Sequence, residues 1–121
     1  MTKATLVVYT NPSDPVREQE YNSWYDEVHL PEVLALEGFV AATRFRLADA
    51  GIEAGAQVPH RYLALYEVES EDLQTTLDAL VAGAATMQMS DALQMDPLPV
   101  TVLFEQISER VVASRPVQAT A

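Results

Sequence analysis

Cysteine is absent from the 121-residue sequence. Its absence excludes disulfides, thiolate catalysis and cysteine-ligated metal sites. Positive charge is also scarce, because seven Lys and Arg residues against eighteen Asp and Glu residues give a formal net charge of −11. Nucleic acids and anionic membranes would both repel so acidic a surface. We therefore expect neither of them as a partner.

Long apolar runs and cofactor-binding motifs are missing too. No segment approaches the roughly 20 apolar residues that span a bilayer, and no apolar core of a signal peptide follows the N-terminus. We therefore expect a cytoplasmic protein. Glycine loops for phosphate or dinucleotide binding are absent, and the two histidines are far apart without HxH or HExxH spacing. We expect no metal and no cofactor.

What remains alternates between strand-like and helix-like segments. Apolar or alternating runs predict strands at 4–10, 39–47, 60–68 and 100–107. Amphipathic spacing predicts helices at 15–28, 31–36 and 71–82, with one or two helical turns within 87–95 and a loop at 49–59. The expected buried stripe of the 71–82 helix is Leu73, Leu77, Leu80 and Val81. Asp14 and Ser70 are the expected N-caps, and Pro31 is expected to end or kink the first helix.

The predicted order is βαββαβ, which is the ferredoxin-like α+β arrangement, an antiparallel sheet with both helices on one face. We expect one domain over 1–110 and a flexible C-terminal tail over 111–121. The first, third and fourth strands carry apolar residues on both faces. Because helices cover only one of these faces, we expect a homodimer formed by sheet-to-sheet packing.

The first helix carries the main candidates for catalysis. His29 follows Tyr25 by one helical turn, so both side chains share a flank of the helix. An imidazole near neutral pH is a natural general acid or base, and a phenol can donate a hydrogen bond to an oxyanion. Two plainer interpretations stay open. His29 could bond a backbone carbonyl at the helix end, and Tyr25 could be a core aromatic residue.

Further candidates for substrate binding have equally plain alternatives. Arg44 could clamp a carboxylate or phenolate, or form a salt bridge with one of the many acids. Trp24 is a candidate pocket wall or core residue, and His60 a solvated loop residue with binding as its minor alternative. Tyr9 and Tyr62 are the remaining candidates, and with Tyr66 they are expected to share one sheet face, where a core role is the plainer alternative. Met87, Met89 and Met95 are expected to fill gaps or form a soft lid.

One stretch of sequence resembles a known family. It contains Trp24-Tyr25-Asp26, His29 three residues later, then Leu30-Pro31, Gly38-Phe39 and a strand with Arg44. This pattern resembles the EthD-like branch of the dimeric α/β-barrel superfamily, although Glu37 stands where a proline often precedes the glycine. The resemblance implies a homodimer whose sheets close into a barrel, with a pocket between sheet and helices in each subunit.

The resemblance also implies a range of activities. The superfamily includes cofactor-free cyclases, isomerases, dehydratases and monooxygenases acting on aromatic or polyketide-like compounds, and some members use haem. Our first hypothesis is a cofactor-independent enzyme, of cyclase, isomerase, dehydratase or decarboxylase type, with His29 as acid/base. The second is a non-catalytic small-molecule binding or accessory protein. The third is a cofactor-free or haem-dependent monooxygenase.

Overall fold

The computed structural model describes residues 1–52 and 58–116. Its strands are β1 (Thr2–Thr10), β2 (Phe39–Arg46), β3 (Tyr62–Ser70) and β4 (Val100–Glu105). Its helical segments are a 3-10 turn (Pro15–Arg17), α1 (Glu18–Trp24), a π-helical turn (Tyr25–His29), α2 (Leu30–Leu34) and α3 (Leu73–Ala84).

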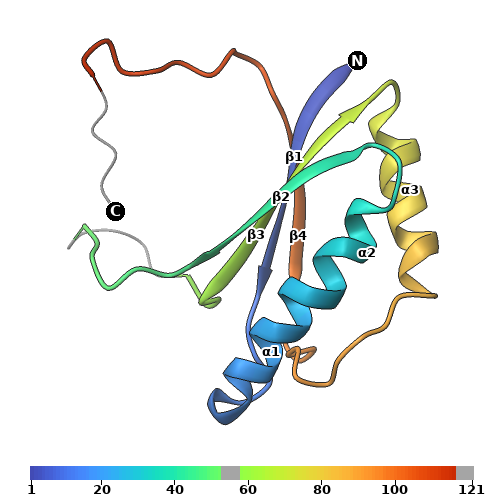
Figure 1. Cartoon of the computed structure of the whole chain (residues 1–121), viewed down its shortest axis with the longest axis vertical. Helices are drawn as coiled ribbons and strands as arrows, with labels where there is room; N and C mark the ends of the chain where they lie inside the picture. The colour runs from blue at the N-terminus through green and yellow to red at the C-terminus, as the bar shows by residue number, and fades with distance from the viewer. Residues whose placement is uncertain (53–57, 117–121) are drawn as a thin grey trace.

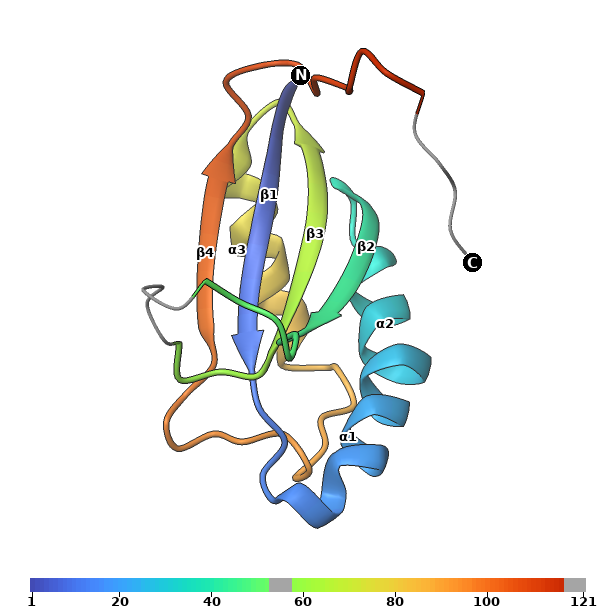
Figure 2. The same cartoon turned by 90° about the vertical axis from the view of Figure 1, so that its left-hand side faces the viewer.

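The four strands form one antiparallel sheet in the order β2-β3-β1-β4. The α1–α2 helix and α3 both lie against the same face of this sheet, so the molecule has two layers (Figures 1 and 2). This arrangement confirms the predicted ferredoxin-like α+β fold.

Strand alternation divides the side chains of the sheet between two faces. On the helix-facing side, Leu6 lies between Tyr66 of β3 and Leu103 of β4 in the strand register. Leu6 and Tyr66 are almost completely buried, as are Tyr21 and Tyr25 of the first helix. The core therefore lies between the central strands and the α1–α2 helix.

The first helix was expected to end or kink at Pro31, and it does not end there. It continues from α1 through the π turn into α2, where the amide of Leu30 donates to the carbonyl of Tyr25. A proline removes one amide donor and crowds the carbonyl four residues earlier in a regular helix. A wider turn just before Pro31 accommodates both effects. The same turn carries Tyr25 at its start and His29 at its end.

Gly38 joins this helix to β2 in a conformation that favours glycine. Its φ is +96°, the left-handed region where side chains are strained. A Cβ atom added at Gly38 would also lie 2.9 Å from Cγ2 of Thr76 in α3. Gly38 therefore permits both the chain reversal and the close approach of α3.

Three local predictions are wrong. Asp72, not Ser70, caps α3, because its carboxylate accepts the amides of Gln74 and Thr75. Val81 was expected on the buried stripe of that helix but is 74% exposed. The helical turns expected within 87–95 are absent from the structure, where Leu93 instead forms a β-bridge with Pro12.

The segment over 85–99 is held beside the end of β1 by backbone bonds. The amide of Ser13 donates to Ala92 O at 2.6 Å, and that of Gln94 donates to Asn11 O at 2.9 Å. Ala92 is fully buried. Pairing of this kind replaces helical hydrogen bonds, which explains why the methionine-rich segment is an irregular connection and not a helix.

No helix of the described residues lies over the other face of the sheet (Figure 2). Its exposed apolar side chains include Phe45 of β2 and Val102 and Phe104 of β4. In the register, Val7 of the central strand lies between Leu65 and Val102. We call this surface the open face, defined by Val7, Tyr9, Phe45, Leu63, Leu65, Val100, Val102 and Phe104.

Residues 106–116 form neither helix nor strand and run away from the sheet (Figure 1). The flexible tail was expected over 111–121. Of these residues, 111–116 are described and have no regular structure, and 117–121 lie outside the described residues. The helices of the described residues lack the length and apolar composition that crossing a bilayer requires.

Candidate functional site

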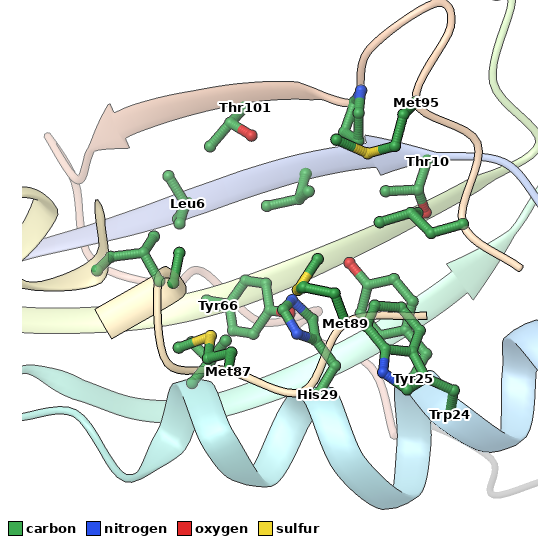
Figure 3. A pocket seen from close by; sticks show the side chains of 16 residues that line it. Leu6, Thr10, Trp24, Tyr25, His29, Tyr66, Met87, Met89, Met95 and Thr101 are labelled. Carbon is green, nitrogen blue, oxygen red and sulfur yellow. The ribbon is translucent and has the colours of Figure 1, made fainter. Parts of the chain in front are cut away.

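A cavity of about 190 Å³ lies between the sheet and its helices. Six elements contribute to its wall: β1, the α1–α2 helix, β3, α3, β4 and the 85–99 segment (Figure 3). The lining residues are Leu6, Val8, Thr10, Trp24, Tyr25, His29, Val33, Tyr66, Leu80, Ala84, Met87, Met89, Leu93, Met95, Pro99 and Thr101. The structure thus brings together three of the predicted site residues, namely His29, Tyr25 and Trp24.

His29 reaches from the π turn into this cavity (Figure 3). Its ring stacks on the Trp24 indole, with centroids 4.8 Å apart and planes 23° apart. It also meets the Tyr25 ring edge to face at 5.1 Å. Two aromatic contacts on neighbouring sides fix the orientation of the imidazole.

The polar atoms of this imidazole have no protein partner in the part of the chain described. Nδ1 is sealed from solvent and makes no hydrogen bond. The idea that His29 bonds a carbonyl at a helix end is therefore wrong, and the helix in fact continues past it. Nε2 is not sealed in this way, so it is the nitrogen that can meet a ligand.

Burial sets the protonation state of His29. Removal from water lowers the pKa of the His29 imidazole below its usual 6.5, because the charged form loses its hydration. The negative charge of Glu32 opposes this shift but is the smaller effect. The imidazole is therefore neutral at pH 7 and can accept a proton.

Two phenols stand beside the imidazole. Burial raises the pKa of Tyr25 to about 12, and its neighbour Tyr66 partly offsets the shift. Burial also raises the pKa of Tyr66. The Tyr66 hydroxyl is sealed and has no hydrogen-bond partner among the described residues. Both phenols stay protonated near neutral pH, which leaves them as hydrogen-bond donors.

Trp24 links the site to the segment that covers it. The indole Nε1–H donates to the carbonyl of Gln88 at 2.8 Å. The amide of Gln88 in turn donates to the Glu32 carboxylate at 3.1 Å. Arg17 adds an ion pair to Asp91 at 2.6 Å. The α1–α2 helix and the 3-10 turn before it therefore hold the 85–99 segment at three points, and that segment presents Met87, Met89 and Met95 to the cavity.

Arg44 lies outside the cavity. It bonds Oδ1 of Asp26 and Oδ1 of Asn22, each at 2.9 Å. Its guanidinium carbon lies over the Tyr25 ring at 4.3 Å and also near the rings of Tyr21 and Tyr62. The salt bridge left open by the sequence is thus the arrangement observed, and the tyrosines separate this cation from the cavity.

The remaining three predicted site residues line a second cavity. Tyr9, His60 and Tyr62 border a space of about 230 Å³ at the end of the sheet, beside Phe45. Tyr9 faces the open side of the sheet, so the three tyrosines do not share a face as expected. His60 is 7% exposed and its Nε2 has no partner in the residues described, which corrects the expectation of a solvated loop residue.

The sequence reasoning missed several wall residues of the first cavity. Tyr66 was expected in the core, but its alternation with Ala64 and Val68 on the helix-facing side was a usable signal. Thr10 ends β1 and its hydroxyl is hydrogen-bonded to that of Tyr21. Leu93 lies on the wall because its segment forms a β-bridge with Pro12. No local sequence pattern predicts this bridge.

Within the described residues, no group of three or more His, Asp or Glu side chains could hold a metal ion. The polar groups of the first cavity are hydroxyls, phenols and one imidazole. What the arrangement can do chemically is accept or donate a proton at His29 and stabilise an oxygen of the ligand by hydrogen bonds.

Neither a protein-family model nor a curated protein matches the sequence. Solved structures do match. An EthD family protein from Bacillus halodurans has 18% identity and a TM-score of 0.57, over 88% of this chain and 100% of that one. An EthD-like protein from Ralstonia eutropha has 16% identity and a TM-score of 0.55, over 91% and 96%.

A third match is a Shewanella loihica protein described provisionally as a monooxygenase. It has 16% identity and a TM-score of 0.53, over 90% of this chain and 99% of that one. Likeness at such low identity establishes the fold and leaves the reaction open. Each match nevertheless extends over nearly the whole of both chains. The chain therefore has the ferredoxin-like fold of EthD-like proteins.

Proposed function

We propose that this protein is a cofactor-independent enzyme that transfers a proton on a small aromatic or polyketide-like compound, with His29 as the general acid/base. The reaction would be of the cyclase, isomerase, dehydratase or decarboxylase type. The observation that carries the proposal is the position of the imidazole, which is held between Trp24 and Tyr25 on the wall of a cavity.

The chemistry follows from the protonation states. Because burial lowers the pKa of His29, the neutral imidazole is available as a base at pH 7. In the proposed step Nε2 accepts a proton from carbon next to a substrate carbonyl, and the electron pair moves onto the carbonyl oxygen. The Tyr25 hydroxyl, with its pKa raised to about 12, stays protonated and donates to that oxygen.

A non-catalytic binding or accessory role is the second candidate, and one observation favours it. Catalytic histidines are commonly oriented by a partner on the second ring nitrogen. In the described structure Nδ1 of His29 has no such partner. Aromatic contacts orient the ring instead. A carrier would bind the same compounds in the same cavity without changing them.

The experiment measures proton exchange, which needs no knowledge of the natural substrate. The protein is incubated with 2-indanone in D₂O, and loss of the α-proton signal is followed by NMR. We expect the wild type to accelerate exchange and His29→Gln to lose at least about 100-fold of that acceleration, which is the usual contribution of acid/base catalysis. Tyr25→Phe should retain part of it.

The matched control is Val16→Gln, since Val16 is 88% exposed and far from the cavity wall. It should leave exchange unchanged. If wild type and His29→Gln exchange 2-indanone equally fast although both bind it, His29 has no acid/base role. The binding or accessory function would then be favoured.

We also propose that two copies pair through the open face. Apolar side chains from all four strands lie on it, and Phe104 is 60% exposed. Its charged residues, Lys3, Glu67 and Glu69, are gathered toward one end by the register. A flat apolar surface of this kind on an otherwise acidic protein is best covered by an identical surface.

A further inference from the structure

Among the described residues, the wall of the cavity beside His29 carries no permanent charge. The sixteen of them that line it include no Asp, Glu, Lys or Arg. A charged ligand would therefore lose its hydration without gaining an ion pair, which is costly in an apolar site. This absence of charge limits the kinds of ligand that the cavity can bind.

One cation packs behind the cavity wall but is unavailable to an anion. Arg44 packs behind the ring of Tyr25, and its guanidinium is occupied by Asp26 and Asn22. Its side chain is only 12% exposed. A carboxylate in the cavity could reach this cation only by displacing Tyr25, which is itself 1% exposed.

The field around the cavity further disfavours anions. The Glu32 carboxylate is close enough to oppose the pKa shift of His29, and the whole chain carries a net charge of −11. Cations gain from this field, but they meet no carboxylate on the wall. The Glu32 oxygens instead accept the amide of Gln88.

The size of the cavity gives a second restriction. A dry cavity of roughly 150 Å³ suffices for benzene, and this one has about 190 Å³. One aromatic ring with a short substituent or a small fused ring fills it. The side chains of Trp24, Tyr66 and Met89 offer flat or soft surfaces to such a ring (Figure 3).

We propose that the cavity selects uncharged compounds that have one aromatic ring and one hydroxyl or carbonyl oxygen, and that it excludes the corresponding carboxylates and amines. The oxygen bonds to Nε2 of His29 while the ring packs among Trp24, Tyr66 and the methionines. This inference rests on the proposed function, since it names the substrate class of the same site. It narrows the expected aromatic or polyketide-like compound to a neutral one.

The test uses three probes of equal size and different charge: benzyl alcohol, benzoate and benzylamine. Binding to the wild type at pH 7.5 is measured by NMR titration. We expect benzyl alcohol to bind at least about tenfold more tightly than either charged probe, a difference of about 1.4 kcal/mol. Equal or tighter binding of benzoate or benzylamine would overturn the inference.

One pair of variants tests whether the probes bind in this cavity, and a second pair tests why anions bind weakly. Ala84→Phe fills the cavity and should abolish binding, whereas Ala82→Phe, at an exposed position on another side of the same helix, should not. Met89→Arg places a cation on the wall at a residue that is 49% exposed. It should raise the affinity for benzoate at least about tenfold relative to Met89→Gln. No gain would mean that a missing cation is not what excludes anions.

The outcome is separable from that of the proposed reaction. Preference for benzoate would overturn the charge selection and leave the role of His29 in 2-indanone exchange intact. Failure of exchange together with a clear preference for benzyl alcohol would overturn the catalytic role and leave the ligand class standing.

Discussion

Trp24 stacks on His29 with ring centroids 4.8 Å apart, and the same indole donates its N–H to Gln88 of the covering segment. One side chain thus orients the imidazole and anchors the wall opposite it. A change that loosens the segment should therefore also loosen His29. This coupling gives the first prediction.

Trp24→Phe keeps a ring against His29 but removes the donor to Gln88. We expect a loss of about 1 kcal/mol in unfolding free energy, which is typical of one hydrogen bond. Hydrogen–deuterium exchange should increase in residues 86–94 while the central strands stay protected. Val16→Ala, at an exposed position, is the control. Unchanged exchange in residues 86–94 would show that the indole does not anchor the segment.

Acid should destabilise the protein through His29. Because burial lowers the pKa of the folded imidazole, both states are neutral above pH 6.5, and His29 adds no pH dependence there. As the pH falls below 6.5, the unfolded chain binds a proton that the folded chain does not, so stability falls by up to about 1.4 kcal/mol per pH unit. His29→Gln should remove this contribution. Urea unfolding between pH 7 and 5 measures it, and parallel curves for the two proteins would contradict the prediction.

Arg44 should matter more for stability than its exposed partner. Arg44→Lys loses the two-pronged contact with Asp26 and Asn22 and weakens the stacking on Tyr25. We expect a cost of about 1–3 kcal/mol, since hydrogen bonds to charged groups and cation–π contacts are lost. Asp26→Asn, whose side chain is 59% exposed, should cost at most about 1 kcal/mol. Equal costs in urea unfolding would indicate that the ion pair, not the stacked guanidinium, is the stabilising feature.

Gly38→Ala should be strongly unfavourable. The new methyl group would be strained at φ +96° and would lie 2.9 Å from Cγ2 of Thr76. We expect a loss of about 1–3 kcal/mol, the usual cost of backbone strain. Gly51→Ala is the matched control, because a Cβ there meets nothing within 4 Å. A thermal unfolding midpoint of Gly38→Ala equal to that of the control would refute this account.

The open face should control oligomeric state. Val102→Asp and Phe104→Asp place a charge on it and should convert a dimer into a monomer in sedimentation experiments. Val81→Asp, which alters an apolar residue exposed on α3, should leave the dimer intact. Since each copy carries a net charge of −11, added salt should strengthen pairing. A wild-type protein that is monomeric at micromolar concentration would contradict the proposed pairing through the open face.

Much of the fold could be read from local pattern. Alternating and amphipathic periods located the strands and both helical regions, because burial of one face imposes these periods. The predictions were wrong where contacts between residues far apart in the sequence determine the local structure. Pro31 lies within a continuing helix because a π turn makes room for it, and 87–95 is not helical because its backbone bonds Asn11 and Ser13.

The candidate site, like the fold, could be predicted only where local spacing determines it. Tyr25 and His29 share a helix flank by spacing alone, so the sequence could place them together. Arg44, Tyr9 and His60 could not be placed in this way. Strand alternation turns Tyr9 toward the open face, and a shell of tyrosines covers Arg44. Such relations depend on strand order and packing across the core.

By itself, the sequence determined the ferredoxin-like order of elements, the acidic surface and the pairing of Tyr25 with His29, because these follow from composition and local periodicity. Only the tertiary structure decided which groups share a cavity and which charges are kept out of it. The reason is physical: the cavity is enclosed by six elements far apart in the chain, and the exclusion of Arg44 depends on how those elements pack.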